Sequence, residues 1–509
     1  MIPTEQKRVV LLAYINRLDE GGFMRSYSNA ALFPFEFLVA YAQKSEEVRR
    51  KWRLSMREYP DVESLIDDVR RVKPAVLGFS CHVLNIATNL KAACAAKAEI
   101  PDIKVVLGGP EVVDAGIYLE ENPFVDYIVR GEGEDTLMRL LKALGNCEDA
   151  TMNIPGLSYR GAQGIVHMEN ASLLEDLGAI PSIFTTERIQ ELGEMVFFQT
   201  SRGCSYGCRM CVWTKHRRRF FPFERVESEL ALLLGNPDVR HIFFIDSEFG
   251  DVPEQTRRVL ECIRRHNKHG TKFTCFLAVE RIDRESLELC AAIGFPTESP
   301  IGLQSIHQDV LNAAGRKWFN VKEFEEQLQM VLEYIPHNVF TMDIIYGLPE
   351  DNYEKLCETV RWCLDHKLDQ LNIIRLGGYP NTAFYRLRDR FGLIFQDRPP
   401  YHVIRSNTFT PEDIEKTERV IIWLQTMLKF LTGNDCVELK KRGVDLVSLC
   451  ETLIESGIDW KRYIRLSNES NIGEVNSEIL LPILEFLRDK RLPPSAFGYL
   501  VSCFVPHIG

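Results

Sequence analysis

Three cysteines, Cys204, Cys208 and Cys211, have the spacing in this chain that best suits chemistry. They lie in the run Ser-Arg-Gly-Cys-Ser-Tyr-Gly-Cys-Arg-Met-Cys-Val-Trp, and no fourth cysteine follows nearby. Iron-sulfur clusters are usually held by four cysteinates. A set of three therefore predicts a cluster with one open iron, and an open metal position is typical of catalysis.

The alternative for these cysteines is a zinc site. Tetrahedral zinc normally needs a fourth cysteine or histidine at short spacing. His216 is close, but it lies in the basic run Lys215-His-Arg-Arg-Arg219, which is either a solvated face or an anion contact. The remaining cysteines of the 14 in the chain are scattered in apolar or helical patterns. We interpret them, Cys147 included, as packing residues, because unpaired cysteines are commonly buried.

A repeating pattern of strands and helices from residue 191 to about 385 must position the cysteine loop. Long amphipathic helices, such as 283–293 and 322–334, fall between most of its strands. Six strands are too few for an eight-fold barrel, so we predict a partial (β/α)6 barrel with its chemistry at the C-terminal rim. The predicted strands are 196–199, 241–245, 273–279, 300–303, 339–346 and 370–376.

The first 150 residues also alternate strands with helices, which predicts an α/β fold with a doubly wound parallel sheet. Such sheets bind ligands at the carboxyl ends of their strands. Three strand ends carry loops with small residues and hydroxyls, where backbone can approach a ligand closely. The candidate binding residues in these loops are Ser80, Cys81, His82, Leu84, Asn85, Gly108, Gly109, Pro110, Glu111, Gly131, Glu132 and Gly133.

Two further segments complete the predicted division of the chain. Residues 151–190 are rich in glycine, proline and short apolar pieces, so we expect a linker between the domain at 1–150 and the domain at 191–390. Residues 391–509 are predominantly helical in pattern. Thr410-Pro-Glu-Asp413 predicts a helix start there. We expect this C-terminal domain to cap the mouth of the active site.

The Cys-x3-Cys-x2-Cys loop resembles that of the radical S-adenosylmethionine enzymes. These enzymes carry the loop after the first strand of a partial or full (β/α) barrel, usually with an aromatic residue where this chain has Met210. The resemblance implies a [4Fe-4S] cluster whose open iron chelates the amino and carboxylate groups of S-adenosylmethionine. Reductive cleavage of the carbon-sulfur bond would release a 5′-deoxyadenosyl radical.

The succession of loops in the first domain resembles the cobalamin-binding domain that precedes many radical S-adenosylmethionine domains. Cobalamin proteins with a histidine as lower axial ligand carry Asp-x-His-x-x-Gly after the first strand, and this chain has no such motif. The resemblance therefore implies base-off cobalamin without a histidine bond, its lower face covered by residues 80–85. His82 is the alternative ligand.

The same resemblance assigns S-adenosylmethionine contacts to loops of the barrel. Asp246-Ser247-Glu248 resembles the turn that holds the amino group, and Gly347-Leu-Pro-Glu350 the segment along the adenine. Gln304, after Gly302, resembles the segment that reaches the ribose or the substrate, although Pro300 leaves the local strand register open. Arg281 and Arg375 could each bind a carboxylate. A salt bridge within the protein is the alternative for either arginine.

Bulk properties restrict the class of protein. The charged fraction of 26% and the hydrophobic fraction of 45% are those of a globular protein. There is no apolar run of about 18 residues and no signal-peptide pattern, so we expect a cytoplasmic protein that does not insert into membranes. A net charge of −11 argues against a nucleic-acid partner.

The domain order implies an enzyme that methylates a carbon centre of a small-molecule or natural-product substrate through methylcobalamin. An external electron donor such as flavodoxin or ferredoxin would reduce it. Two alternatives stay open. Some relatives catalyse ring contraction or ring closure without methyl transfer, and a regulator that binds cobalamin or the cluster without turnover would be a protein of another class.

Overall fold

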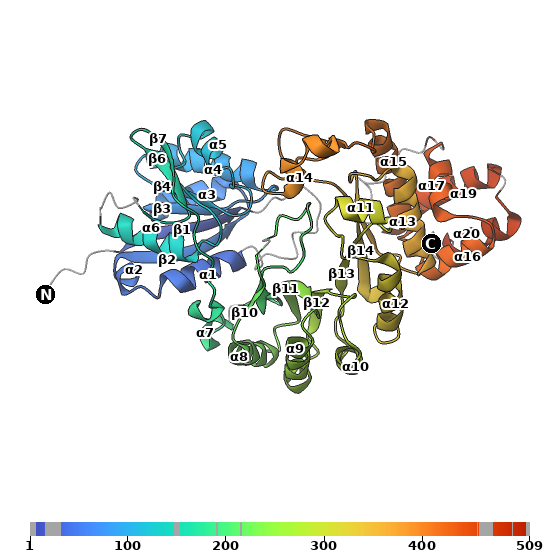
Figure 1. The fold of residues 1–509 in the computed structure, drawn as a ribbon, viewed down its shortest axis with the longest axis horizontal. Coiled ribbons are helices and arrows are strands. Elements are labelled where there is room, and N and C mark those ends of the chain that lie inside the picture. The colour runs from blue at the N-terminus through green and yellow to red at the C-terminus, as the bar shows by residue number, and fades with distance from the viewer. Residues whose placement is uncertain are drawn as a thin grey trace.

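The computed structural model describes residues 7–15, 32–146, 153–189, 192–213, 216–455, 457, 472–490 and 492–504. Cys147 and Lys215 lie outside these ranges. Figure 1 shows an α/β domain, a barrel domain and a helical region arranged in that order along the longest axis. No helix in the described ranges combines the length and apolar character needed to cross a bilayer.

The N-terminal domain is built on a seven-stranded sheet with the order β2-β1-β3-β4-β5-β6-β7, in which β1 to β5 are parallel. The predicted parallel sheet is confirmed. Strand β2 was not predicted, because it pairs only with β1 and mixes charged with apolar residues, so it lacks the apolar run of a central strand. The parallel strands are β1 (Arg8–Ile15), β2 (Trp52–Tyr59), β3 (Val76–Ser80), β4 (Lys104–Gly108) and β5 (Tyr127–Val129).

Helices cover both faces of this sheet. Helices α3, α4 and α5 bury apolar side chains against one face, and α1, α2 and α6 against the other. In α3, for example, the Asp61 side chain accepts a hydrogen bond from the Ser64 amide, and Leu65 and Val69 are buried one turn apart. The helices are α1 (Phe33–Ala42), α2 (Glu46–Lys51), α3 (Val62–Val72), α4 (Ile86–Glu99), α5 (Ala115–Glu121) and α6 (Glu134–Asn146).

The segment 151–190, predicted as a linker, contributes to the sheet. Strands β6 (Leu157–Gly161) and β7 (Gly164–His167) form a hairpin, and β6 pairs antiparallel with β5. Ser158 and Leu157 of β6 are fully buried. The hairpin therefore extends the sheet of the first domain, and only the part of the segment after it connects to the barrel, with a short helix α7 (Thr186–Ile189).

The second domain is a partial barrel of six parallel strands, as predicted. The strands form two three-stranded sheets, β8-β11-β12 and β13-β14-β15, joined by a bridge between Thr274 and Glu298. Pro300 lies within β13 and pairs in regular register with Thr341. The strands are β8 (Met195–Phe198), β11 (His241–Phe249), β12 (Lys272–Leu277), β13 (Ser299–Gln304), β14 (Phe340–Tyr346) and β15 (Leu371–Arg375).

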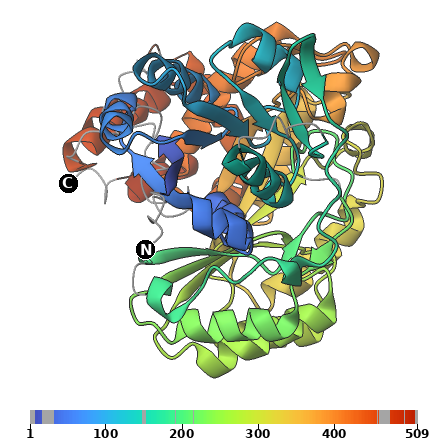
Figure 2. The same ribbon diagram turned by 90° about the vertical axis from the view of Figure 1, so that its left-hand side faces the viewer.

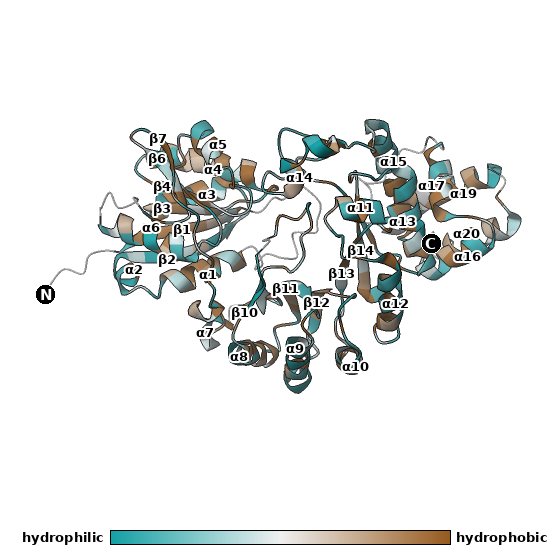
Figure 3. Cartoon of the chain, viewed as in Figure 1, coloured by the Kyte–Doolittle hydropathy of each residue, from teal (hydrophilic) through white to brown (hydrophobic). Residues whose placement is uncertain are grey.

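The barrel helices pack on the outside of the strands, which is clear in Figure 2 below the sheet domain. They carry both hydrophobic and hydrophilic residues in Figure 3, as amphipathic helices between a core and solvent must. Buried aromatic rings, including Phe244, Phe273 and Phe295, fill the core beneath them. The helices are α8 (Phe223–Leu234), α9 (Pro253–His266), α10 (Arg284–Ile293), α11 (Gln308–Ala313), α12 (Val321–Leu332) and α13 (Tyr353–Asp365).

The C-terminal region is helical, but the expectation that it caps the mouth of the active site is wrong. Three of its helices pack against α13 on the outside of the barrel (Figure 1), where Lys440 bonds Asp365 at 2.6 Å and Leu449 joins the core that contains Val360. Thr410 and Asp413 form the capping box that starts the first long helix. The elements after β15 are α14 (Ala383–Arg386), β16 (Ile394–Phe395), β17 (Val403–Arg405), α15 (Pro411–Met427), α16 (Gly433–Lys441), α17 (Leu446–Ile454), α19 (Ile472–Asp489) and α20 (Pro494–Phe504).

Candidate functional site

The predicted cluster loop follows β8 and is closed at its base by two short antiparallel strands. These are β9 (Ser201–Arg202) and β10 (Arg219–Phe220). Gly203 comes next with a φ of +95°, and a Cβ atom at this position would lie 2.6 Å from the carbonyl oxygen of His216. Because only glycine tolerates both features, the loop can close tightly just before Cys204.

All three predicted cluster cysteines line one cavity of about 330 Å³ at the C-terminal ends of the barrel strands. Met210, which stands in place of the usual aromatic residue, lines it as well. We call this the cluster cavity. The tight loop thus presents Cys204, Cys208 and Cys211 to a common space, which is the arrangement that a shared cluster needs.

The three cysteines in this cavity are partly buried. Burial raises the pKa of Cys204 to about 11 and raises the pKa of Cys208. Iron must therefore displace thiol protons, as metal binding to cysteine generally does. In the described ranges, no three cysteine, histidine, aspartate or glutamate side chains converge as ligands of one metal ion. In an iron-sulfur cluster, by contrast, different cysteines bind different irons.

Polar groups that line the same cavity as the cysteines fit S-adenosylmethionine. Gln304 has a φ of +70° at an irregularity of β13, and its Oε1 is buried without a hydrogen-bond partner among the described residues. Nε of Arg316, which lines the same cavity, is also buried without a hydrogen-bond partner among the described residues. A buried unpaired acceptor beside a buried unpaired guanidinium donor would be satisfied by the ammonium and carboxylate groups of an amino acid. Of the predicted contacts, Ser247, Glu248 and Gln304 line the cluster cavity.

Three charged residues that line this cavity were not among the predicted contacts: Glu280, Arg316 and Asp343. Burial raises the pKa of Asp343 to about 6, while Asn372 donates to its Oδ1 at 3.1 Å. Burial also raises the pKa of Glu248 to about 8. Helix α11 lies between Gln304 and Arg316 in the sequence. The spacing of the two residues therefore gave no reason to expect the Arg316 guanidinium near the C-terminal end of β13.

Five predicted contacts do not line the cluster cavity, and four of them are Arg281, Arg375, Gly347 and Glu350. Arg281 lies over the ring of Tyr206, 4.8 Å from its centroid. Arg375 donates to Glu418 at 2.6 Å, which is the salt-bridge alternative. A Cβ atom at Gly347 would lie 2.5 Å from the Val403 side chain, and Glu350 accepts a bond from Asn407 at 2.8 Å. The later segment that contains β17 therefore covers the Gly-Leu-Pro-Glu turn.

Asp246 is the fifth predicted contact that does not line the cluster cavity, and it instead binds the residues that follow β8. Its side chain is completely buried and accepts a 2.7 Å bond from the hydroxyl of Thr200 and further bonds from the Thr200 amide and the Ser201 hydroxyl. Asp246 thus ties strand β11 to the start of the cluster loop. Its neighbours Ser247 and Glu248 face the cavity.

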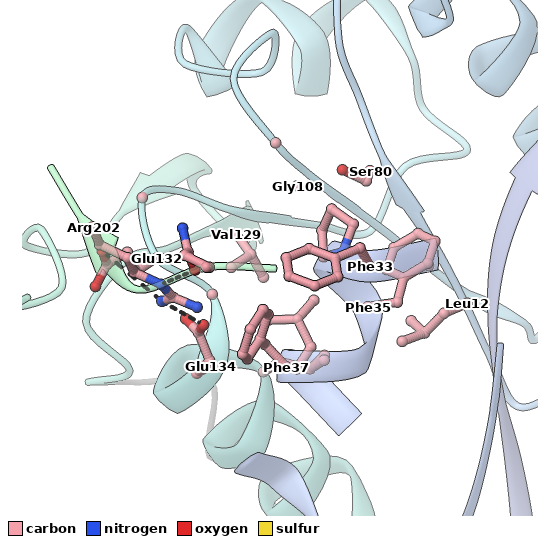
Figure 4. Close-up of a pocket in the computed structure, with 18 of the residues that line it drawn as sticks. Leu12, Phe33, Phe35, Phe37, Ser80, Gly108, Val129, Glu132, Glu134 and Arg202 are labelled. Carbon is pink, nitrogen blue, oxygen red and sulfur yellow. Dashed lines mark hydrogen bonds and ion pairs between the residues drawn. The ribbon is translucent and has the colours of Figure 1, made fainter. Parts of the chain in front are cut away.

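A second cavity, of about 340 Å³, opens between the sheet of the first domain and the barrel (Figure 4). We call it the sheet cavity. Six of the predicted cobalamin contacts line it: Ser80, Gly108, Gly109, Gly131, Glu132 and Gly133. Phe33, Phe35 and Phe37 of α1 form an aromatic wall that was not predicted.

The lining of the sheet cavity fits the ring of a large cofactor. Gly131 has a φ of +78° and no atom within 4 Å of where a Cβ would be, so its backbone is open to a ligand. Aromatic side chains on one side and glycine backbone on the other suit a flat heterocycle. Cobalamin would thus be held at the carboxyl ends of β3, β4 and β5, as expected for such a sheet.

The other six predicted cobalamin contacts do not line this cavity. Cys81 and Asn85 are buried, and the Asn85 side chain accepts from the His82 amide at 2.8 Å and donates to the Ser80 carbonyl at 2.9 Å. Burial lowers the pKa of His82, which favours the neutral imidazole. The full set outside the lining is Cys81, His82, Leu84, Asn85, Pro110 and Glu111.

The two cavities adjoin, because Trp213 and Ser247 line both. Trp213 is 47% exposed and follows the third cysteine by two positions. A ligand on the sheet side and a ligand on the cluster side would therefore meet at this indole. The sequence could have suggested a role for Trp213 only through its position two residues after Cys211. That it also lines the sheet cavity depends on how the two domains pack.

Comparison with known proteins agrees with this arrangement. Residues 198–363 match the family model of the radical SAM superfamily, and residues 51–141 match that of the B12 binding domain. The first match contains the cluster loop and most of the barrel. The second contains β2 to β5 of the sheet.

Two curated relatives match most of the chain. The cobalamin-dependent radical SAM methyltransferase TokK of Streptomyces tokunonensis is 26% identical over 78% of this chain and 61% of its own length. The anaerobic magnesium-protoporphyrin IX monomethyl ester cyclase of Cereibacter sphaeroides is 27% identical over 66% of this chain and 57% of its own. The chain thus spans about three fifths of the length of these relatives.

Among solved structures, the cobalamin-dependent S-adenosylmethionine radical enzyme OxsB with aqua-cobalamin and S-adenosylmethionine bound has a similar fold. Its TM-score is 0.62 at 15% identity, over 99% of this chain and 84% of that one. Sheet domain, cysteine loop, adjoining cavities and both family matches together identify the cofactors as a [4Fe-4S] cluster, S-adenosylmethionine and cobalamin. The chain thus carries a B12 binding domain followed by a radical SAM domain.

Proposed function

We propose that this chain is a methyltransferase that methylates a carbon centre of a small-molecule or natural-product substrate. The observation that carries the proposal is the junction at Trp213 and Ser247, where the sheet cavity and the cluster cavity meet. Cobalamin would supply the methyl group there, and S-adenosylmethionine at the cluster would supply the hydrogen-abstracting radical. A substrate at the junction would reach both.

Residues of this chain surround the junction and would orient the reactants there. Trp213 packs edge to face on Phe276, and Ile245 and Met210 add apolar surface nearby. An apolar junction protects a reactive radical from side reactions and orients a substrate by shape. The strong polar groups, Glu248 and Arg316 among them, lie in the cluster cavity, where they can hold the amino acid part of S-adenosylmethionine.

Several finer points belong to the same proposal. The cobalamin would have no histidine as its lower axial ligand, since His82 lies outside the sheet cavity and the axial-histidine motif is absent from the sequence. We propose that it binds base-off. We also propose that an external donor such as flavodoxin or ferredoxin reduces the cluster, and that the reaction takes place in the cytoplasm. A net charge of −11 favours a small molecule over a nucleic acid as substrate.

The experiment uses the full chain with reconstituted cluster and bound cobalamin, under anaerobic reducing conditions. With methyl-labelled S-adenosylmethionine and a panel of small molecules, we expect S-adenosylhomocysteine, 5′-deoxyadenosine and a labelled product. Unlabelled, rearranged product with 5′-deoxyadenosine alone would instead support ring formation, the class of reaction to which the cyclase relative belongs. Failure to form either S-adenosylmethionine product would support the non-catalytic regulator.

A further inference from the structure

Four charged side chains join the two domains beside the sheet cavity. Arg219 donates to both carboxylate oxygens of Glu132, at 2.5 and 3.1 Å, and Arg202 donates to Glu134 at 2.7 Å. Arg202 also lies 4.0 Å from Glu132. We call this group of four the ionic clamp. Figure 4 shows Arg202 between the two glutamates, next to the aromatic wall of the cavity.

The ionic clamp is shielded from solvent. The side chains of Arg219 and Glu134 are 3% and 5% exposed, and those of Arg202 and Glu132 are 12% and 13% exposed. Arg219 lowers the pKa of Glu132 although burial opposes this, so the carboxylate stays charged. Removing one partner of such a pair leaves a buried uncompensated charge, which is far more costly than losing a surface pair.

Each half of the clamp belongs to a cofactor site. Glu132 lies between Gly131 and Gly133, in the loop that rims the sheet cavity, and Glu134 starts helix α6. Arg202 immediately precedes the cluster loop, and Arg219 is its cross-strand partner where that loop ends. Any shift of the glycine loop is therefore transmitted to both ends of the cluster loop.

We propose that the ionic clamp couples cobalamin binding to the conformation of the cluster loop, with Glu132, Glu134, Arg202 and Arg219 as positioning residues. Cobalamin fixes the glycine loop, the clamp fixes the base of the cluster loop, and the binding of each cofactor favours the other. Thermodynamic reciprocity requires that the cluster strengthen cobalamin binding by the same factor. This inference rests on the cofactors and is independent of the reaction catalysed.

The test measures the dissociation constant of hydroxocobalamin for the full chain with a reconstituted cluster and for the Cys204→Ala/Cys208→Ala/Cys211→Ala chain, which cannot hold one. We expect the cluster to tighten binding by roughly 5- to 150-fold, the usual range of coupling between sites. The ratio of interest is the dissociation constant without the cluster divided by that with the cluster. Glu132→Gln keeps the shape of the side chain but removes its charge. When it is added to both chains, we expect this ratio to fall to about one.

Arg217→Gln is the matched control, because Arg217 also lies in the cluster loop and pairs with Glu175, but both side chains are largely exposed. It should leave the ratio unchanged. If Glu132→Gln does not fold, Arg202→Lys provides the second variant, since it keeps the charge but loses the planar fork. A second readout is amide hydrogen exchange in the cluster loop of the chain with an oxidised cluster, which hydroxocobalamin should slow in the wild-type chain but not in Glu132→Gln. A ratio of one in the wild-type chain, or a wild-type ratio in both clamp variants, would overturn the proposal.

Discussion

The indole of Trp213 meets the ring of Phe276 edge to face, with ring centroids 6.2 Å apart. Phe276 belongs to β12 of the barrel, whereas Trp213 follows the cluster cysteines and also lines the cavity of the other domain. An aromatic side chain that is 47% exposed contributes less to folding than a buried one. Its position instead suits contact with a substrate.

Trp213→Ala should therefore reduce turnover without loss of either cofactor. We expect a fall in kcat/KM of roughly tenfold to a hundredfold, because a substrate that loses this wall is misplaced relative to the reacting atoms. Cluster absorbance and cobalamin content report whether the sites remain intact. Ile117→Ala, another exposed apolar residue that lines neither cavity, is the control. Equal activity in both variants would remove Trp213 from the substrate site.

Cys204→Ala should abolish 5′-deoxyadenosine formation, since two cysteines and one vacant position cannot hold the cluster as three do. Cobalamin should still bind at saturating concentration, because the sheet cavity is lined mainly by residues of the first domain. Its affinity should fall only by the coupling factor of the ionic clamp. Iron content, the product assay and a cobalamin titration check the three parts. A protein that binds no cobalamin at any concentration would show that the sheet domain cannot hold its cofactor independently.

Asp343 makes the stability of the cofactor-free chain depend on pH. Its pKa in the fold is about 6, raised by burial from the ordinary value of 3.8. Between these values the unfolded chain loses this proton while the folded chain keeps it, so stability falls as pH rises through this window. Above pH 6 the cost is about 3 kcal/mol at most.

Asp343→Asn should remove that cost. The variant without cofactors should unfold at higher denaturant than the wild type at pH 7.5 and at nearly the same denaturant at pH 3.5, while its affinity for S-adenosylmethionine falls. Asp397→Asn, at an exposed position, should change neither quantity. A stability difference that is equal at both pH values would contradict the raised pKa.

Tyr401 connects the segment after the barrel to the first domain. Its hydroxyl donates to Oε1 of the buried Glu111 at 2.7 Å, and Tyr118 of the same domain as Glu111 donates to that oxygen at 2.9 Å. Tyr401→Phe should weaken the docking of this segment by about 1–3 kcal/mol, because a hydrogen bond to a charged group is lost. Faster amide hydrogen exchange in β17 would report it.

Tyr118→Phe is the matched control for Tyr401→Phe. It also removes one hydrogen bond to Oε1 of Glu111, but Tyr118 belongs to the same domain as Glu111. It should speed exchange in α5 and leave β17 as in the wild type. Similar exchange of β17 in the two variants would mean that Tyr401 does not hold the segment.

Local sequence pattern determined the architecture of this protein. Central strands such as Val76–Ser80 and Phe340–Tyr346 are short apolar runs between helices, and the Cys-x3-Cys-x2-Cys loop lies directly after one of them. These features depend on neighbours in the chain, so they could be predicted. The edge strand Trp52–Tyr59 and the hairpin in 151–190 could not, because exposure on one side removes the apolar run that marks a strand.

Only the tertiary structure decided which side chains reach the cofactor cavities. Gly347 and Glu350 belong to a motif that suggests S-adenosylmethionine, yet Val403 and Asn407 from a later segment pack against them. Conversely, Trp213 faces the sheet domain, and Glu132 pairs with Arg219 across the domain boundary. Such contacts join residues far apart in the chain, and their geometry follows from how the sheet and the barrel pack rather than from any local pattern.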